Sequence, residues 1–358
     1  AGSVVGSAIC LFVCVALALT ALLTVLTEPF CRLLQAPEEA FVPTAQYVRI
    51  CSAGTLFIVA FNVIGSVFRG LGDSKMPLIT VAIACVTNIF GDLLLVDVLQ
   101  MGAAGAALAT VFAQAISVIL SLLVIMRRKL PFTFRKEQLR FDQPLTAGIL
   151  RLGIPIALQD VLVGVSFLVI LAIVNSLGLL QSAGMGIAEK VCAFVMLLPS
   201  AFSQSVSAFV AQNTGAGKPE RAKKALRCGV IVSLCISVFV FYFNFFHGDL
   251  LAGIFANDRA VILEAADYLK AYAIDCLLTS FLFCFVGYFS GLGKTVFVMT
   301  QGILGAFGVR IPVSFAMSRL PNVRLFYIGL ATPCSTVVQV LLCLGYYAHL
   351  ARKERGKR

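Results

Sequence analysis

Long apolar segments follow one another along the whole chain, each of about 20 residues or more. A helix of that length rises far enough to cross the apolar layer of a bilayer, which is roughly 30 Å thick. The segments are too continuous for barrel strands, in which apolar and polar positions alternate over about 10 residues. The pattern therefore predicts an all-α, polytopic membrane protein. The ten predicted spans lie at about 4–27, 41–67, 77–97, 103–126, 148–177, 185–211, 225–246, 262–289, 295–317 and 326–350.

Parts of the sequence occur twice. Phe68-Arg-Gly-Leu-Gly72 returns 221 positions later as Phe289-Ser-Gly-Leu-Gly293, and Tyr47 has a counterpart at the same shift in Tyr268. A third echo, shifted by 222, pairs Leu108-Ala-Thr110 with Leu330-Ala-Thr332. Two homologous membrane bundles in one chain are typical of secondary transporters, whose substrate path runs between the bundles.

The repeat also predicts the domain organisation. The expected parts are a first lobe at 1–126, a cytoplasmic linker at 127–145, a second lobe at 146–350 and a basic tail at 351–358. Subtracting the shift from the start of the second copy places the start of the first copy about 70–75 residues before Ala1, which is room for two helices. We therefore expect two homologous six-helix lobes, with the first two helices absent from this chain and ten present.

Composition and charge agree with a membrane protein. Charged residues make up 13% of the chain, against roughly a quarter in soluble proteins. The net charge of +11 arises from basic residues in alternate connections and in the tail, which hold 20 of the 28 lysines and arginines. This is the bias of the positive-inside rule, so we expect the basic side and both chain ends to be cytoplasmic, with no nucleic-acid partner.

Other function classes lack their signatures in this sequence. The twelve cysteines form no CxxC pair, most of them lie in apolar segments, and the chain has two histidines. No zinc motif, nucleotide-binding loop or selectivity-filter sequence occurs. A membrane enzyme or a channel is therefore disfavoured.

Asn88, Asp92 and Thr110 form the main candidate site. Asn88 and Asp92 share one helix face at i, i+4, and the next helix opens with small residues that allow its Thr110 to approach them. A carboxylate, an amide oxygen and a hydroxyl suit a hard cation such as Na⁺. The same carboxylate, removed from water, could carry a proton instead, and a structural polar contact between two helices is the third reading.

The chain resembles the multidrug and toxic compound extrusion (MATE) family. The resemblance rests on the Asn88–Asp92 pair and on three motifs. These are Phe-Arg-Gly-Leu-Gly-Asp-Ser-Lys-Met-Pro77, Gly105-Ala-Ala-Leu-Ala-Thr110 and Ala208-Phe-Val-Ala-Gln-Asn-Thr-Gly-Ala-Gly217. It implies two six-helix lobes and the exchange of Na⁺ or H⁺ for organic, often cationic, compounds, with no other cofactor.

The resemblance also implies roles for the candidate residues. Family members with an ion site in the first lobe use an asparagine and an aspartate four apart on the fifth helix and a threonine on the sixth, which Asn88, Asp92 and Thr110 match. An aspartate on the first helix, the fourth ligand, would precede Ala1. In the second copy the shift leads to Val309 and Val313, so an ion site of this type is expected in the first lobe alone.

Five polar residues of the second lobe are predicted to line a substrate cavity. Asp275 and Arg310 fall inside apolar segments, where each needs a partner, and a static ion pair between them is the alternative reading. Gln159, Asn175 and Gln204 lie in otherwise apolar helices, where hydrogen bonding between helices is an equally good explanation.

The predicted function is therefore that of a secondary antiporter. We expect it to export small, amphipathic, cationic compounds in exchange for Na⁺ or H⁺, as a monomer in the lipid of the cell membrane. The alternative is a flippase for a lipid-linked precursor, whose cavity would be rich in arginine and lysine for pyrophosphate. Only Arg310 lies well inside an apolar segment, which argues against it.

Overall fold

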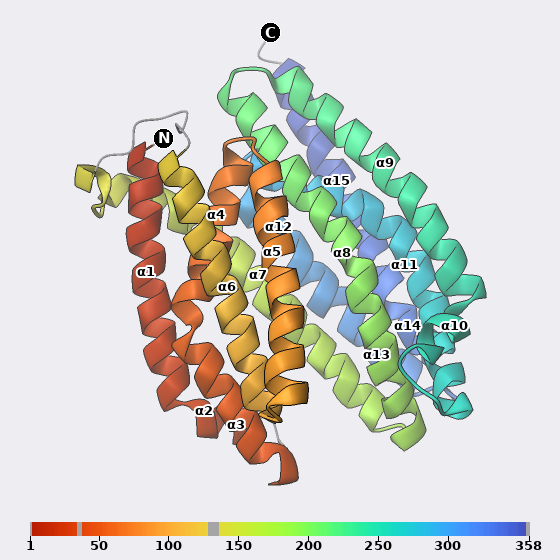
Figure 1. Ribbon diagram of the computed structural model, residues 1–358. Coiled ribbons are helices and arrows are strands. Elements are labelled where there is room, and N and C mark those ends of the chain that lie inside the picture. Colours follow the sequence, from red (N-terminus) through yellow and green to blue (C-terminus); the bar gives the residue numbers. More distant parts are fainter. Residues whose placement is uncertain (1, 34–37, 128–135, 356–358) are drawn as a thin grey trace. The chain divides into compact units, whose positions relative to one another are not determined.

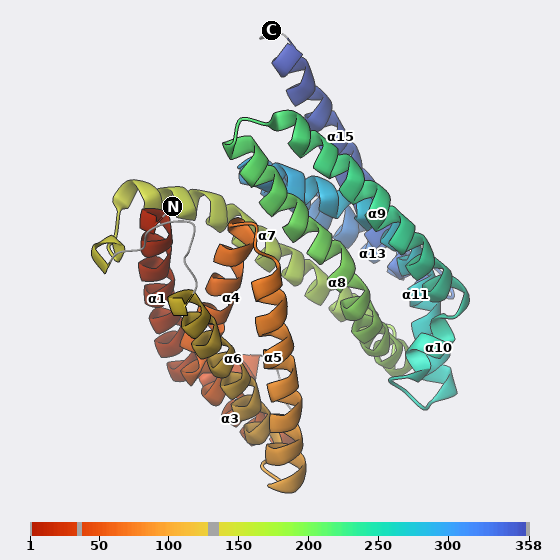
Figure 2. The same cartoon turned by 45° about the horizontal axis from the view of Figure 1, so that its top comes forward.

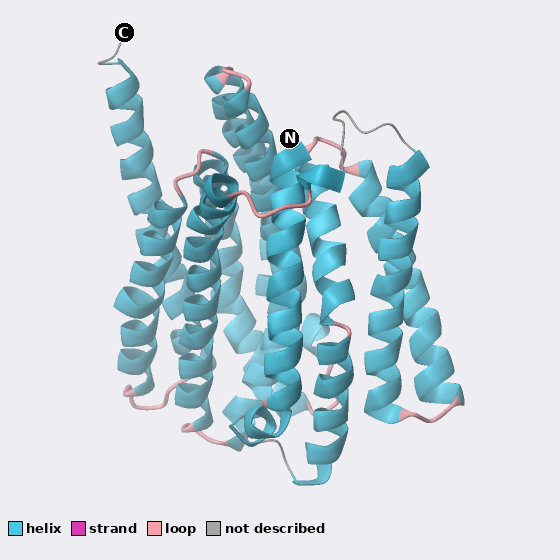
Figure 3. Cartoon of the chain, turned by 90° about the vertical axis from the view of Figure 1, so that its left-hand side faces the viewer, coloured by secondary structure: helices cyan, strands magenta, loops and turns pink. Residues whose placement is uncertain are grey.

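The computed structural model describes residues 2–33, 38–127 and 136–355, and over these ranges the chain is helical with no strand (Figure 3). The chain divides into two compact units, residues 1–150 and 151–358. The all-α fold predicted from the sequence is confirmed.

The first unit holds the helices coloured red to yellow in Figure 1. They are α1 (Gly2–Val25), α2 (Thr27–Leu33), α3 (Glu38–Ala53), α4 (Thr55–Gly70), α5 (Lys75–Asp92), the π-helix η1 (Leu93–Val98), α6 (Gly102–Arg127), the short 3₁₀-helix η2 (Lys136–Gln138) and the first turns of α7 (Gln143–Asn175). Helix α6 lies against α3, α4 and α5, so the centre of this unit is the small-residue face of α6.

The second unit continues from α7 to the C-terminal end of the described chain. It contains α8 (Leu179–Gly215), α9 (Pro219–Phe246), α10 (Gly248–Gly253), α11 (Arg259–Gly291), α12 (Thr295–Ile303), the π-helix η3 (Leu304–Arg310), α13 (Ile311–Ser318), α14 (Leu325–Gly329) and α15 (Ala331–Arg355). Helix α11 packs on α8, α9 and α15, and α8 and α9 run side by side in Figures 1 and 2. Because α11 is the most buried span, it forms the centre of this unit.

The number of membrane spans agrees with the sequence pattern. Among the described residues, nine helices are long and apolar enough to cross a membrane, and α3 with α4 makes a tenth if that bent pair counts as one span. The sequence predicted an unbroken helix at 41–67, whereas the structure bends it by 54° at Gly54. At the bend the backbone packs closely on α6, where a Cβ on Gly54 would overlap the side chain of Val111.

The predicted domain boundaries fall close to helix ends but stay a prediction. Helix α6 ends at Arg127, and 128–135 of the predicted linker lie outside the described residues. Helix α7 begins at Gln143, before the predicted lobe start at 146, and continues across the division between the two units.

The repeated Phe-x-Gly-Leu-Gly motif forms the same helix end in both units. After α4 the amide that follows Gly72 donates to the carbonyl of Phe68 at 3.0 Å, and after α11 the amide that follows Gly293 donates to the carbonyl of Phe289 at 2.8 Å. Gly72 has φ +85° and Gly293 has φ +71°, the left-handed conformation that closes this type of helix end. The two copies of the sequence are therefore also copies in backbone geometry.

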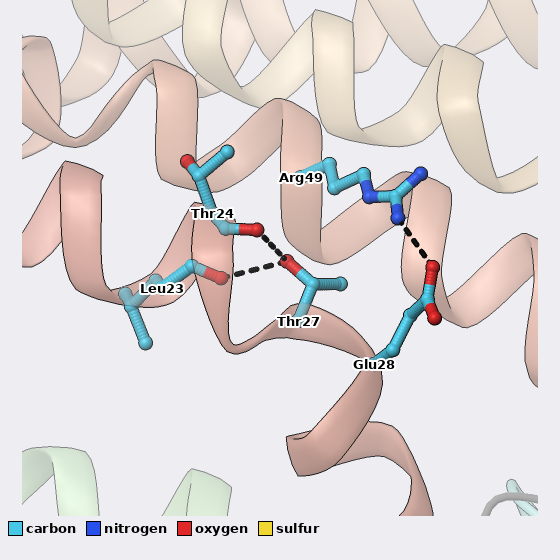
Figure 4. Close-up of polar contacts among 5 residues, drawn as sticks. All are labelled: Leu23, Thr24, Thr27, Glu28 and Arg49. Atoms are coloured by element: carbon cyan, nitrogen blue, oxygen red, sulfur yellow. Dashed lines mark hydrogen bonds and ion pairs between the residues drawn. The ribbon is translucent and has the colours of Figure 1, made fainter.

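Polar contacts fix the ends of spans. Where α1 meets α2, the Thr27 hydroxyl donates to the carbonyls of Leu23 (2.7 Å) and Thr24 (3.3 Å), and Arg49 of α3 pairs with Glu28 at 2.7 Å (Figure 4). Both charged side chains are about half exposed, so the pair contributes at most about 1 kcal/mol to stability.

A second ion pair joins α11 to the start of α14. The Arg324 guanidinium donates to both carboxylate oxygens of Asp267, at 3.1 and 2.5 Å. The hydrogen bond and the negative charge of Asp267 raise the pKa of Arg324. Because the contact uses two parallel hydrogen bonds, it fixes the direction in which α14 leaves the turn.

The close approach of α11 to α8 predicts a strong effect of Gly287→Ala. A Cβ at this position would overlap the backbone carbonyl oxygen of Ser203, which a side-chain rotation cannot relieve. We expect a loss of about 1–3 kcal/mol, the usual range for overpacking. Thermal unfolding can be followed with a maleimide dye that reacts as buried cysteines such as Cys284 become exposed.

Gly345→Ala is the matched control for this substitution. Gly345 lies on α15 with open space around its Cβ direction, and alanine is the better helix former. Equal unfolding midpoints for the two variants would contradict the close packing of α11 on α8.

Candidate functional site

Asn88, Asp92 and Thr110 lie together where α5 packs on α6. The Asn88 Nδ2 donates to the Thr110 Oγ1 at 3.4 Å, and Thr110 donates to the carbonyl of Ala106 at 3.0 Å. Asp92 follows Asn88 by one turn on the same face of α5. The distance of 3.4 Å between Asn88 Nδ2 and Thr110 Oγ1 is near the limit for a hydrogen bond, so this contact is weak.

Small residues allow these two helices to approach. A Cβ on Gly91 would lie 2.9 Å from the Cβ of Ala109, and a Cβ on Gly105 would lie 2.9 Å from the carbonyl oxygen of Leu95. Further along, the Ser117 hydroxyl donates to a backbone carbonyl of α5 at 2.9 Å. Close backbone approach at small residues is a common mode of helix packing in membranes, and here it brings Thr110 towards Asn88.

Asp92 is the charged member of the group. Its Oδ1 is buried and accepts no hydrogen bond from any residue that the structure describes. The π-helix η1 begins directly after it, at Leu93, and π-helical turns inside helices occur often at functional sites. An acidic oxygen without a donor, next to a local change in helix register, is an arrangement that a bound cation or proton would complete.

Tyr47 of α3 adds a fourth side chain that the sequence analysis did not assign to the site. Its side chain lies near enough to Thr110 and Asp92 to interact with both electrostatically. The repeat had marked Tyr47 through its echo in Tyr268, but a tyrosine in an apolar segment has no specific signature. The site therefore takes oxygen atoms from α3, α5 and α6.

The chemistry of this group is that of an all-oxygen site. It offers one carboxylate, one amide oxygen and two hydroxyls, which suit Na⁺ or a proton better than a thiophilic metal. Among the described residues, no three His, Cys, Asp or Glu side chains come together as metal ligands.

The second unit repeats part of this arrangement. The side chain of Tyr268 in α11 lies near that of Thr332 in α15, as Tyr47 lies near Thr110. The positions that correspond to Asn88 and Asp92 hold valines, Val309 and Val313, so the second copy of the tyrosine–threonine contact has neither the amide nor the carboxylate.

Asp275 and Arg310 supply the buried charges of the second unit. Their side chains belong to residues that are 1% and 6% exposed. Arg310 donates to the Ser166 hydroxyl at 3.2 Å, and its guanidinium carbon lies 4.5 Å from the ring centre of Phe167. Among the described residues, neither oxygen of Asp275 has a hydrogen bond within the usual distance limit, although the Thr336 side chain lies near the carboxylate. Their opposite charges attract each other across a distance longer than a direct ion pair.

The other three predicted cavity residues make different contacts. The Gln159 side chain of α7 packs against Gly302 of α12. Asn175 is exposed at the end of α7 and accepts a hydrogen bond from Ser182 at 2.7 Å, and Gln204 is on an exposed part of α8. In this unit the structure brings Asp275 and Arg310 near each other but not the full set, and the cavity role of the five residues stays a prediction.

Comparison with known proteins gives consistent matches. The chain is 26% identical to "Probable multidrug resistance protein YoeA" of Bacillus subtilis, over 99% of this chain and 78% of that protein. It is 30% identical to "Probable multidrug resistance protein YpnP" of the same organism, over 84% of this chain and 65% of that protein. A crystal structure of MATE in complex with MaL6 superposes with a TM-score of 0.92, at 16% identity, over 99% of this chain and 80% of the other.

The family assignment rests on the sequence. The model of the MatE family matches residues 1–94 and 155–316, which include the Asn88–Asp92 pair and most of both units. The structural match confirms the fold. The match to the family model confirms the resemblance that the sequence motifs indicated. This chain belongs to the MatE family, whose members are multi-pass membrane transporters and not enzymes.

Proposed function

We propose that this protein is a secondary antiporter that exports small, amphipathic, cationic organic compounds in exchange for Na⁺ or H⁺. Two curated relatives carry multidrug resistance in their names, which supports organic compounds as the substrate class. The distribution of basic residues supports a multi-pass protein of the cell membrane with both described ends of the chain in the cytoplasm. We expect it to act as a monomer.

The observation that carries this proposal is the buried Asp92 oxygen without a donor. Asn88, Thr110 and Tyr47 belong to the same group of side chains and offer further oxygen atoms. A carboxylate at membrane depth is energetically costly when uncompensated, so binding of a cation or proton stabilises the state that encloses it. An ion that binds two conformations with different affinity shifts their populations, which is what coupling requires.

Antiport then follows because the coupling ion and the organic compound favour different conformations of the protein. Ion binding at Asp92 favours the conformation that releases the organic compound, and loss of the ion restores the conformation that binds it. The organic cation and the coupling ion need not share a site, since linkage between two sites of one protein is reciprocal. The second unit, with valines in place of Asn88 and Asp92, contributes no ion site of this type.

Efflux of a fluorescent organic cation tests the proposal. Drug-hypersensitive bacteria that express the complete protein are loaded with ethidium, and its loss is followed with and without external Na⁺ and at two values of external pH. We expect export that exceeds the empty-vector rate and that depends on one of the two ions. Export that ignores both gradients would contradict antiport, and failure of a well-expressed protein to export any of several cations would favour the flippase.

A further inference from the structure

A basic cavity lies at one end of the second unit, where α9 and α12 begin and α15 ends. Figure 1 shows the course of these helices. Its volume is about 230 Å³. Three lysines line it from three separate segments, Lys223 of α9, Lys294 before α12 and Lys353 near the end of α15. This is the basic side of the protein, which the positive-inside rule assigns to the cytoplasm.

The three ammonium groups leave the cavity positively charged. Lys223 pairs with Glu220 on the same helix at 3.2 Å, which offsets one of the three charges. Lys294 and Lys353 are exposed. Like charges that converge on one cavity repel each other, and this repulsion is relieved when an anion binds between them. The cavity is therefore suited to an anionic group.

The start of α12 strengthens this preference. Lys294 lines the cavity and is the residue before the first turn of α12. The N-terminus of a helix carries partial positive charge and unpaired amides, which favour phosphate and carboxylate groups. Lysine ammonium groups bind phosphate as point charges.

The remaining walls of the cavity are aromatic and apolar. Tyr288 and Tyr347 meet edge to face with ring centres 5.8 Å apart, and Leu292 and Leu350 complete this side. Tyrosines at the ends of membrane spans lie at the level of the lipid headgroups. A ligand with a negative head and an apolar stem matches both halves of the cavity, whereas free phosphate would use only the lysines.

We propose that this cavity binds the phosphate headgroup of an anionic phospholipid. Lys294 and Lys353 contact the phosphate, and the tyrosine and leucine side chains contact the first part of the acyl chains. Basic pockets between membrane helices are known places for anionic headgroups. The bound lipid would join the ends of α9, α12 and α15. This proposal does not depend on which ion or compound is transported.

Lipid binding to the purified protein tests this assignment. The complete protein in a mild detergent is titrated with phosphatidylglycerol, and retained lipid is counted by native mass spectrometry. We expect the double variant Lys294→Gln/Lys353→Gln to bind phosphatidylglycerol about thirtyfold more weakly, because each lysine at an anionic surface contributes roughly a factor of five. Phosphatidylcholine, which has no net charge, should be retained poorly by both proteins.

A matched variant distinguishes lipid binding in this cavity from general attraction of anionic lipid to the basic side of the protein. Lys218→Gln/Lys224→Gln removes the same charge from the same side of the unit, at exposed positions that do not line the cavity. We expect it to bind phosphatidylglycerol like the wild type. Equal weakening of phosphatidylglycerol binding in the two double variants would overturn the proposal. Displacement of the lipid by inorganic phosphate at equal concentration would also overturn it, because that result would identify a site for free phosphate. Thermal unfolding of each variant without lipid shows that it remains folded.

Discussion

Asp92→Asn is expected to abolish ion-coupled export while leaving the protein folded. The substitution keeps the shape of the side chain and removes the only negative charge among the four side chains of the site. A charged partner contributes up to about 3 kcal/mol to such a contact, which corresponds to roughly a hundredfold loss of ion affinity. Ethidium efflux, measured as above at a fixed expression level, should fall to the empty-vector rate.

Two further variants decide whether this loss belongs to the site. Asp97→Asn makes the same change in the same segment at an exposed position of η1 and should export normally. Thr110→Val and Thr332→Val remove the hydroxyl from the two copies of the tyrosine–threonine contact. Only Thr110→Val should alter the dependence of ethidium export on Na⁺ or pH. Normal export by Asp92→Asn would reduce Asp92 to a structural residue and remove the main support for antiport.

The same site shows which features the sequence could predict. The i, i+4 spacing of Asn88 and Asp92 is a local property of a helix, so their shared face followed directly from the sequence. The approach of Thr110 also followed, because glycine and alanine at the start of α6 allow the two helices to pack closely. Tyr47 was not found, since its position depends on how α3 packs against α6, and no local pattern encodes that contact.

Helix irregularities show the same limit. The two π-helices, η1 and η3, leave no hydrophobic pattern of their own, because one extra residue per turn hardly alters a run that is apolar on every face. The bend at Gly54 lies where the chain packs on Val111 of another helix, a contact that the local sequence does not reveal. By contrast, the helix ends at Gly72 and Gly293 were visible as a repeat, since a left-handed residue almost requires glycine.

The buried charges of the second unit posed a different problem. Apolar surroundings indicated that Asp275 and Arg310 need partners, and their attraction is present in the structure. The partners that Arg310 contacts directly are Ser166 and Phe167 of α7. Serine and phenylalanine occur at many positions of the apolar helices, so nothing in the sequence distinguishes these two residues as partners of Arg310. Sequence reasoning therefore predicted the need for compensation but not the helix that supplies it.

Arg310→Gln is expected to destabilise the second unit more than Asp275→Asn does. Loss of the guanidinium leaves a carboxylate that is 1% exposed, with Thr336 near it but no hydrogen bond within the usual distance limit from any described residue. Removing one partner of a buried charge pair usually costs about 3–5 kcal/mol. Asp275→Asn leaves Arg310 in contact with Ser166 and the Phe167 ring, so we expect a smaller loss of stability for this variant. Thermal unfolding with the maleimide dye measures both.

The double variant Asp275→Asn/Arg310→Gln separates a structural pair from a substrate-binding pair. Because it removes both charges, its unfolding midpoint should return towards the wild type, and the non-additivity of the three variants gives the interaction between the two residues. If the pair only balances charge, the double variant also recovers ethidium efflux. If Asp275 holds the organic cation, as the sequence analysis predicted, stability returns while efflux stays lost. Additive losses of stability would show that the two charges do not compensate each other.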